Sequence, residues 1–449
     1  MHPEDEIGLI TPRRRHSHPA NIANAPQPAR RSVKREPKLE AAADELGLLE
    51  YPTRVSGTRV QLYAKPIGKD YVDRIRVDKT LVSKGFWDRV DYITHICLPR
   101  QSGKTFNMQP IRLFFSPFPE LDCLDIPPDC ADYAAYSRER RESFFKDSLL
   151  KKKYPEFFAE HFMKRSAIYI SFESCKFKSC GSMTKLLCQA IARTAQRHLD
   201  EFKCAYRETH SIVLEAEKSL RTRLETVYTV CSMSGDDTTQ YGGLPLTLFS
   251  ALSRFVHQQY GSYILLVNEY DVPFLSLFEG TWDKVDKEGA TIDLQHLFWG
   301  MCKGNYDVHK GLLVGVIDVD IANDVYILQD ICLIPKHLRY NNENGCQVST
   351  LDCFGGKKCD LANAFWFNKR EVALMLALCT TWFDGTSGLH GVILDNIREH
   401  YGGYYIDYSD NKYNPWSVCS FIKQLCDSPM LAGMGVANVI GVNMPEYWE

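Results

Sequence analysis

The chain has 449 residues, of which 45% are hydrophobic and 24% are charged, and its formal net charge is −3. This length exceeds that of one average domain, and the composition is that of a globular protein. The near-neutral charge excludes an overall field that attracts nucleic acid or an anionic membrane. No apolar run reaches the ~18 residues of a membrane span, and the polar N-terminus lacks a signal-peptide pattern. We therefore expect an intracellular protein, cytoplasmic or nuclear, without a membrane partner.

The first segment, residues 1–50, is rich in Pro, Ala, Asn and charge and has few large apolar side chains. Such a composition cannot offset the entropy of ordering, so we expect a disordered basic tail. Two basic clusters lie in it, at Arg13–Arg15 and Arg30–Arg35. They favour a solvated tail, and a nuclear-import signal is the second interpretation.

The most informative stretch follows the first predicted strand, Tyr92–Cys97, and has the sequence LPRQSGKT over residues 98–105. A loop that binds nucleotide phosphates needs inward-facing backbone N–H groups, a lysine and a hydroxyl for Mg²⁺. Gly103, Lys104 and Thr105 supply these parts, although Leu98 stands where the usual pattern has its first glycine. The sequence therefore predicts a phosphate-binding loop at this point.

The other loop residues are Arg100, Gln101 and Ser102. For Arg100, a phosphate contact and a structural ion pair are equally good interpretations. The next expected helix, Thr105–Phe115, would direct its N-terminus at the phosphates. Pro110 lies inside that helix and predicts a kink or an early end.

Between this loop and the next informative stretch, helical patterns alternate with a single strand pattern. The expected elements are a loop over 116–137, a charged helix over Arg138–Lys153, a strand over Ala167–Phe172, long helices within 182–230, a loop over 231–243 and a helix over Pro245–Tyr260.

A second apolar run, Ser262–Val267, leads directly into Asn268, Glu269, Tyr270 and Asp271. A buried strand that delivers acidic residues at its C-terminal end suits a Mg²⁺ and water site facing a phosphate loop. A surface carboxylate at a strand end is the alternative for Glu269 alone. The upstream Gly-Lys-Thr sequence favours the paired nucleotide site.

A fourth strand is expected over Gly311–Asp318, and residues 340–449 carry no further long strand pattern. Helical patterns occur there at Phe367–Cys379 and Ile393–His400. Strands that alternate with helices imply an α/β fold with a mainly parallel sheet flanked by helices. The C-terminal part is expected to be a helical lid or satellite.

Several of these motifs together resemble the AAA-ATPase-like family, whose members typically carry a Tyr-Val-Asp-Lys-Thr element, a Pro-Arg-Arg-Phe-Gly-Lys-Ser loop and an Asp-Glu-Tyr-Asp box. The resemblance spans roughly residues 60–425 and keeps the order of the family's motifs. The matching stretches are VDKT at 77–80, PRQSGKT at 99–105, VNEYDVP at 267–273, KGLLVGV at 310–316, and YGGY at 401–404 followed by YNPWS at 413–417.

The resemblance implies a P-loop NTPase fold that binds ATP and Mg²⁺, with the family domain over residues 55–340 and its C-terminal helical region over 341–449. In that case Lys104 binds the β- and γ-phosphates, Thr105 and Asn268 serve the Mg²⁺, and Glu269 polarises the attacking water. The whole loop from Arg100 to Thr105 would contact the nucleotide. Asp271 is either a supporting acid or an ordinary loop acid.

Four positions depart from the family pattern. Asn268 replaces the usual Mg²⁺-associated aspartate, Asp318 replaces a frequent arginine, and Gln101 and Ser102 replace an arginine and an aromatic residue. These changes allow nucleotide binding but disfavour fast hydrolysis. We therefore expect an ATP-binding protein and slow ATPase, and the alternative is a catalytically degenerate module for nucleotide binding or protein interaction.

Other features of the family bear on partners. Asp78-Lys79-Thr80 is either an adenine- or ribose-docking element or, as the sequence favours, a helix start capped by Asp78. The residues after Ser417 are too few for the PD-(D/E)xK nuclease-like domain of many members, so we expect no nuclease activity. A protein partner or a homo-oligomer fits the family, whereas nucleic acid is supported only by the basic tail.

Overall fold

The computed structural model describes only part of the chain, and every described residue belongs to the compact unit Pro37–Glu449. The basic tail lies outside the described residues except for Leu48–Leu49, and so do Arg100, Gln101 and Asp318. The described residues are 48–49, 76–89, 91–98, 102–117, 133–205, 215–233, 241–280, 282–302, 305–316, 348–352, 361, 365–380, 394–395, 397–398, 404–405, 411–415, 417–419 and 421.

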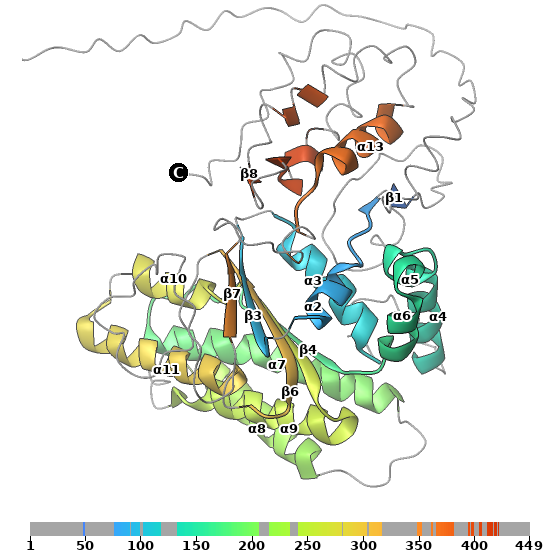
Figure 1. Ribbon diagram of the computed structural model, residues 1–449. Coiled ribbons are helices and arrows are strands. Elements are labelled where there is room, and N and C mark those ends of the chain that lie inside the picture. The colour runs from blue at the N-terminus through green and yellow to red at the C-terminus, as the bar shows by residue number, and fades with distance from the viewer. Residues whose placement is uncertain are drawn as a thin grey trace, which may run out of the picture. The chain divides into compact units, whose positions relative to one another are not determined.

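A five-stranded sheet with the strand order β4-β5-β6-β3-β7 forms the centre of this unit (Figure 1). Every neighbouring pair in it is parallel, which confirms the expected α/β fold with a parallel sheet. The strands are β3 (Ile93–Cys97), β4 (Ala167–Ser171), β5 (Tyr263–Asn268), β6 (Val308–Gly315) and β7 (Val348–Asp352).

The edge strand β7 lies within residues 340–449, where the sequence shows no further long strand pattern and predicts a helical region. Its five residues include only two large apolar ones, Val348 and Leu351, so no buried-strand pattern is visible in the sequence. Two short antiparallel ribbons lie outside the central sheet. They pair β1 (Leu48–Leu49) with β2 (Arg76–Val77), and β8 (Tyr404–Tyr405) with β9 (Asn411–Lys412).

One layer of helices covers the face of the sheet that presents Ile264 and Leu266 of β5. Its core is dominated by aromatic rings, such as Phe114 stacked on Phe157 at 5.5 Å between ring centroids. The helices of this layer are α2 (Val82–Trp87), α3 (Lys104–Phe115), α4 (Tyr133–Phe145), α5 (Leu149–Lys153) and α6 (Pro155–His161).

A second layer packs on the opposite face, against Leu265 and Val267 of the same strand. Because both faces of β5 are buried, the strand needs a continuous apolar run rather than an alternating pattern. The helices of this layer are α7 (Cys180–Ala205), α8 (Glu215–Ser232), α9 (Leu244–Tyr260), α10 (Val272–Glu279) and α11 (Lys284–Cys302).

Helix α3 ends at Phe115, which confirms the expected C-terminal bound, and Pro110 does not end the helix early. Pro110 and its neighbours are buried in the core, and this packing outweighs the loss of one helical hydrogen bond. The helical segment expected over Arg138–Lys153 is divided between two helices. Helix α4 ends at Phe145, and Ser148 caps α5 by accepting a hydrogen bond from Lys151 N.

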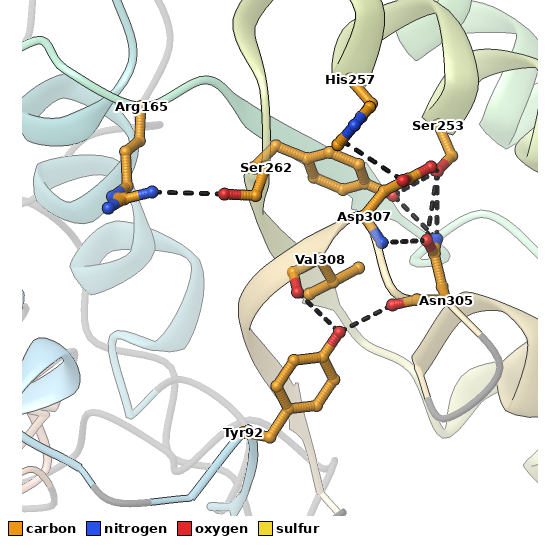
Figure 2. A network of polar contacts seen from close by, with 9 residues as sticks. Tyr92, Arg165, Ser253, His257, Ser262, Asn305, Asp307 and Val308 are labelled. Atoms are coloured by element: carbon orange, nitrogen blue, oxygen red, sulfur yellow. Dashed lines mark hydrogen bonds and ion pairs between the residues drawn. The ribbon is translucent and has the colours of Figure 1, made fainter.

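Polar side chains tie together the amino-terminal edge of the sheet, where β5 and β6 begin (Figure 2). Asn305 Nδ2 donates to Tyr263 Oη at 2.9 Å, and Ser253 Oγ on α9 lies 2.9 Å from the same oxygen. Tyr92 Oη, from just before β3, lies 2.7 Å from the carbonyl oxygen of Asn305. His257 and Asp307 extend the network through a polar contact of 3.2 Å between Nδ1 and Oδ1. This edge is therefore held by mutually satisfied polar groups.

The C-terminal helix α13 (Lys369–Thr380) begins with a capping box. Asn368 Oδ1 accepts from Glu371 N, and Glu371 Oε2 accepts from Asn368 N, each at 2.9 Å. The other oxygen of Glu371 forms a buried ion pair of 2.7 Å with Lys79. None of the helices in the described part of the chain combines the length and apolarity needed to cross a membrane.

Candidate functional site

The strand order creates a switch point between β3 and β6. After β3 the chain crosses to β4, the outermost strand on one side of the sheet. After β6 it crosses to β7, the outermost strand on the other side. In open parallel sheets, ligands bind outside the carboxyl ends of the strands at such a point. The predicted site residues follow the carboxyl ends of β3 and β5, so they lie where the fold favours a ligand.

The turn between β3 and α3 depends on Gly103. This residue has φ = 79°, in the left-handed region where a side chain costs free energy, and it caps the N-terminus of α3. Asn107 makes two hydrogen bonds to Gly103. Its backbone N–H and its side-chain Nδ2 both donate to the Gly103 carbonyl, at 2.9 and 3.1 Å. The first turn of α3 thus begins at Lys104 with its N–H groups at the carboxyl edge.

A chain of hydrogen bonds links α3 to the ends of β5 and β4. Thr105 Oγ1 donates to Asn268 Oδ1 at 3.2 Å, across 163 residues of sequence. Asn268 Nδ2 donates in turn to Ser171 Oγ, also at 3.2 Å. Asn268 is fully buried, and these two hydroxyl groups give its amide oxygen and its amide nitrogen one hydrogen-bond partner each. The sequence did not single out Ser171, since a serine ending a strand carries no distinctive pattern.

The two charged residues of the site lie close to each other. Lys104 Nζ is 3.6 Å from Glu269 Oε1 and donates to the carbonyl oxygen of Leu98 at 3.1 Å. Lys104 is buried and Glu269 is largely so. Burial raises the pKa of the Glu269 carboxyl above its ordinary value, while the charge of Lys104 acts in the opposite direction. The site therefore contains a carboxylate whose charged form is disfavoured by burial, and a buried cation lies beside it.

Glu269 also has an unusual backbone. Its φ is 52°, and among the described non-glycine residues only Met163 shares a positive φ. A left-handed conformation costs a non-glycine residue roughly 1–2 kcal/mol, and such strain clusters at functional sites. The structure around it fixes this conformation, because the next backbone N–H, that of Tyr270, donates to Val314 O at 3.3 Å.

The geometry assigns Asp271 a structural position. Its Oδ2 accepts from the backbone N–H of Val316 at 2.7 Å, which joins the end of β5 to the end of β6. Gly315 makes this approach feasible, because a Cβ there would lie 2.6 Å from Asp271 Oδ1. Asp271 is fully buried, and it supports the loop that carries Glu269. The KGLLVGV motif contained Gly315, but only the structure shows why glycine is needed.

The predicted residues are thus brought together where they can be described. Gly103, Lys104, Thr105, Asn268 and Glu269 converge at the carboxyl edge. Ser102 is buried next to them, and its hydroxyl has no hydrogen-bond partner within the described part of the chain. Arg100, Gln101 and Asp318 cannot be placed because they lie outside the described residues.

The Asp78-Lys79-Thr80 element has structural partners. Asp78 accepts backbone N–H groups from Thr80 and from Leu149, the first residue of α5, each at 2.7 Å. Lys79 donates to the carbonyl of Trp366 at 2.9 Å as well as to Glu371. Helix α2 begins at Val82 with Leu81 as its N-cap and without a side-chain cap hydrogen bond, so Asp78 does not cap that helix as expected. Asp78 instead accepts the first backbone N–H of α5, and Lys79 binds Glu371 in the first turn of α13, so both side chains have structural partners.

The described residues hold no group of three or more His, Cys, Asp or Glu side chains that could bind a metal by itself. Mg²⁺ usually keeps several waters and takes few protein ligands beside substrate phosphates, so the Thr105 and Asn268 oxygens suit it only together with a nucleotide. Comparison of this chain with models of protein families, curated proteins and solved structures found no match.

Proposed function

We propose that the carboxyl edge of the sheet binds ATP together with Mg²⁺, and that the fold is that of a P-loop NTPase. The observation that carries this proposal is the meeting of α3 with the end of β5. Thr105 and Asn268 are joined by a hydrogen bond, and Lys104 and Glu269 face each other at 3.6 Å. A phosphate-binding lysine and hydroxyl thus stand against the residues that would serve the metal and the water.

The topology supports the same proposal. Strand β6 separates β3 from β5 in the sheet, so one strand lies between the lysine strand and the acidic strand. This arrangement fits the branch of P-loop ATPases that has an extra strand and a catalytic glutamate. Within this proposal, the C-terminal region around α13 acts as a helical lid or satellite, tied to the core through Lys79 and Glu371.

The contacts of Lys104 suggest how a nucleotide would be accommodated. The β- and γ-phosphates would replace the Leu98 carbonyl as acceptors of the Lys104 ammonium, which is a stronger, charge-assisted interaction. The same exchange would draw Lys104 away from Glu269, and the carboxylate would become available to orient water. ATP would in this way separate an ion pair that otherwise neutralises both groups.

Hydrolysis is expected to be slow because Asn268 brings no negative charge to the metal. This observation also favours the second candidate, a nucleotide-binding module for protein interaction that no longer hydrolyses ATP. Asn268→Asp distinguishes the two candidates. An aspartate fits the same position, since the Thr105 and Ser171 hydroxyls can both donate to it. Faster phosphate release by this variant supports the slow ATPase, and an unchanged absence of release supports the module.

The test of binding is a calorimetric titration of the full chain with ATP in the presence of Mg²⁺. Lys104→Ala removes a charge-assisted contact, which is worth about 1.5–3 kcal/mol, so the affinity should fall tenfold or more. Lys310→Met is the matched control. Lys310 is a partly buried lysine that, like Lys104, donates to backbone carbonyls, those of Trp87 and Arg89, but it lies near the start of β6. Equal ATP affinity of the Lys104→Ala and wild-type proteins would overturn the proposal.

A further inference from the structure

Helix α11 carries apolar side chains on the side that faces away from the core. Val285, Ile292 and Trp299 are 77%, 40% and 44% exposed. They follow one another at intervals of seven residues, so they form one line along the helix with a drift of only ~20° per interval. The line, called the α11 stripe below, is about 21 Å long at 1.5 Å per residue. The opposite side of α11 is buried through Leu294, Leu297, Phe298 and Met301.

The composition of the α11 stripe is that of an interaction surface. Exposed single apolar residues are common on proteins, but an aligned set that includes a tryptophan is typical of the centre of an interface. Gly289 lies beside the stripe between Val285 and Ile292, and the space above it is open. The backbone of another helix can therefore approach α11 closely at this point.

We propose that a second copy of this chain covers the α11 stripe, through an antiparallel pair of α11 helices whose two-fold axis passes by Ile292. An antiparallel pair is self-complementary under two-fold symmetry. It places Ile292 against itself and the small Val285 of each copy against the large Trp299 of the other. It also places Gly289 opposite Gln295, so that a longer side chain meets the open space.

The charged residues select the antiparallel arrangement over the parallel one. The antiparallel register sets Glu288 of one copy opposite His296 of the other, which combines an acceptor with a donor. A parallel register would set Glu288 against Glu288, and like charges across an interface disfavour association. Lys284 lies 3.9 Å from Glu288 on the same helix and Asp293 lies near His296, so these two groups flank the pairs.

An interface built around one helix face is small, so we expect a weak dimer that dissociates in the micromolar range. The measurement is sedimentation of the full chain without nucleotide, over about 1–100 µM. Trp299→Ala should raise the dissociation constant at least about 30-fold, because an interface hot spot contributes ~2 kcal/mol or more. Ile292→Lys should abolish the dimer, since it places two positive charges at the axis.

Tyr228→Ala is the matched control, because Tyr228 is an aromatic residue of α8 that is 57% exposed. It should leave the dissociation constant unchanged, and thermal unfolding should show that all variants remain folded. A chain that is monomeric throughout the concentration range, or a dimer that Trp299→Ala and Ile292→Lys do not weaken, would overturn the proposal. A monomer would indicate that another protein, or another segment of this chain, covers the stripe.

A charge exchange tests the register. Glu288→Lys and His296→Glu should each weaken the dimer, by setting Lys against His and Glu against Glu. The double variant should restore it, because each lysine then faces a glutamate of the other copy. In a parallel pair the double variant would juxtapose like charges at both positions and associate least of all. Failure of the double variant to recover the affinity would therefore contradict the antiparallel pairing.

Discussion

The two edges of the central sheet are built in opposite ways. At the amino-terminal edge, Tyr263, Ser253 and Asn305 satisfy one another through hydrogen bonds of 2.9–3.2 Å. At the carboxyl edge, Lys104 and Glu269 are desolvated charges, and Glu269 and Gly103 have left-handed backbones. The amino-terminal edge contributes stability. The carboxyl edge contains backbone strain and desolvated charges, which proteins retain mainly where a ligand or a reaction needs them. Substitutions at the two edges should therefore have separable effects.

Glu269→Gln is expected to show the largest difference between its effect on ATP hydrolysis and its effect on stability. If Glu269 orients the attacking water as proposed, its loss should reduce phosphate release by about 10²–10⁴-fold. The same variant should unfold at a higher temperature at pH 8. Because burial raises the Glu269 pKa, its stabilising contribution is present at low pH and is lost as pH rises through the folded-state pKa. Parallel phosphate-release and thermal-unfolding measurements check both parts, and a less stable variant would contradict the assigned desolvation.

The next largest effect is a pH dependence of the free energy of unfolding, which we expect from His95 in β3. His95 is buried, with its ring 5.3 Å from that of Tyr270, and burial lowers its pKa to about 4. Between pH 6.5 and 4 the unfolded chain binds a proton that the folded chain does not. Stability should therefore fall as pH decreases through this window, by up to about 3 kcal/mol.

Denaturant unfolding at several pH values measures how steeply the free energy of unfolding changes with pH. His95→Phe should make this change smaller. His309 also has a pKa lowered to about 4, by burial and by Arg165 and Lys310, but it is only half-buried at the opposite edge. His309→Gln should therefore flatten the slope less than His95→Phe does. If the His309 variant reduced the pH dependence of stability as much as His95→Phe or more, the main titrating group would lie at the amino-terminal edge, which would contradict this assignment to His95.

At the amino-terminal edge, Asn305→Ala should lower the free energy of unfolding by about 1–3 kcal/mol. The substitution removes the Asn305 hydrogen bond to the buried Tyr263 hydroxyl and both Asn305 contacts of the buried Ser253 hydroxyl. It should not alter ATP affinity, since Asn305 lies at the far end of the strands from Lys104. A titration that shows weakened ATP binding by a folded Asn305→Ala protein would remove the distinction between the two edges.

The smallest effect concerns backbone strain. Glu269→Gly should stabilise the fold by about 1 kcal/mol, because glycine adopts a positive φ without the penalty. Met163→Gly is the matched control, since Met163 has φ = 62° but lies outside the site. Both variants should gain stability in denaturant unfolding, whereas only Glu269→Gly should lose hydrolysis. A stability loss in both would show that their side-chain contacts outweigh the strain.

The sequence allowed the parallel sheet and most of the candidate site to be predicted, for identifiable reasons. Strands buried on both faces leave continuous apolar runs, as in Tyr263–Asn268. Gly103, Lys104 and Thr105 are adjacent, so their spacing alone is informative. The edge strand Val348–Asp352 was missed, because it lacks an apolar run. Ser171 and the need for glycine at position 315 were also missed, because both depend on contacts between strands distant in sequence.

The central claim is that Thr105 and Asn268 form the metal-binding half of an ATP site. The direct measurement is the ratio of ATP dissociation constants with excess EDTA and with Mg²⁺, for the wild type, Thr105→Ser and Thr105→Ala. Serine keeps the hydroxyl that lies 3.2 Å from Asn268 Oδ1, and alanine removes it. We predict that Mg²⁺ tightens ATP binding in the wild type and in Thr105→Ser, and that the ratio falls to about one in Thr105→Ala. An undiminished Mg²⁺ effect in Thr105→Ala would contradict this account.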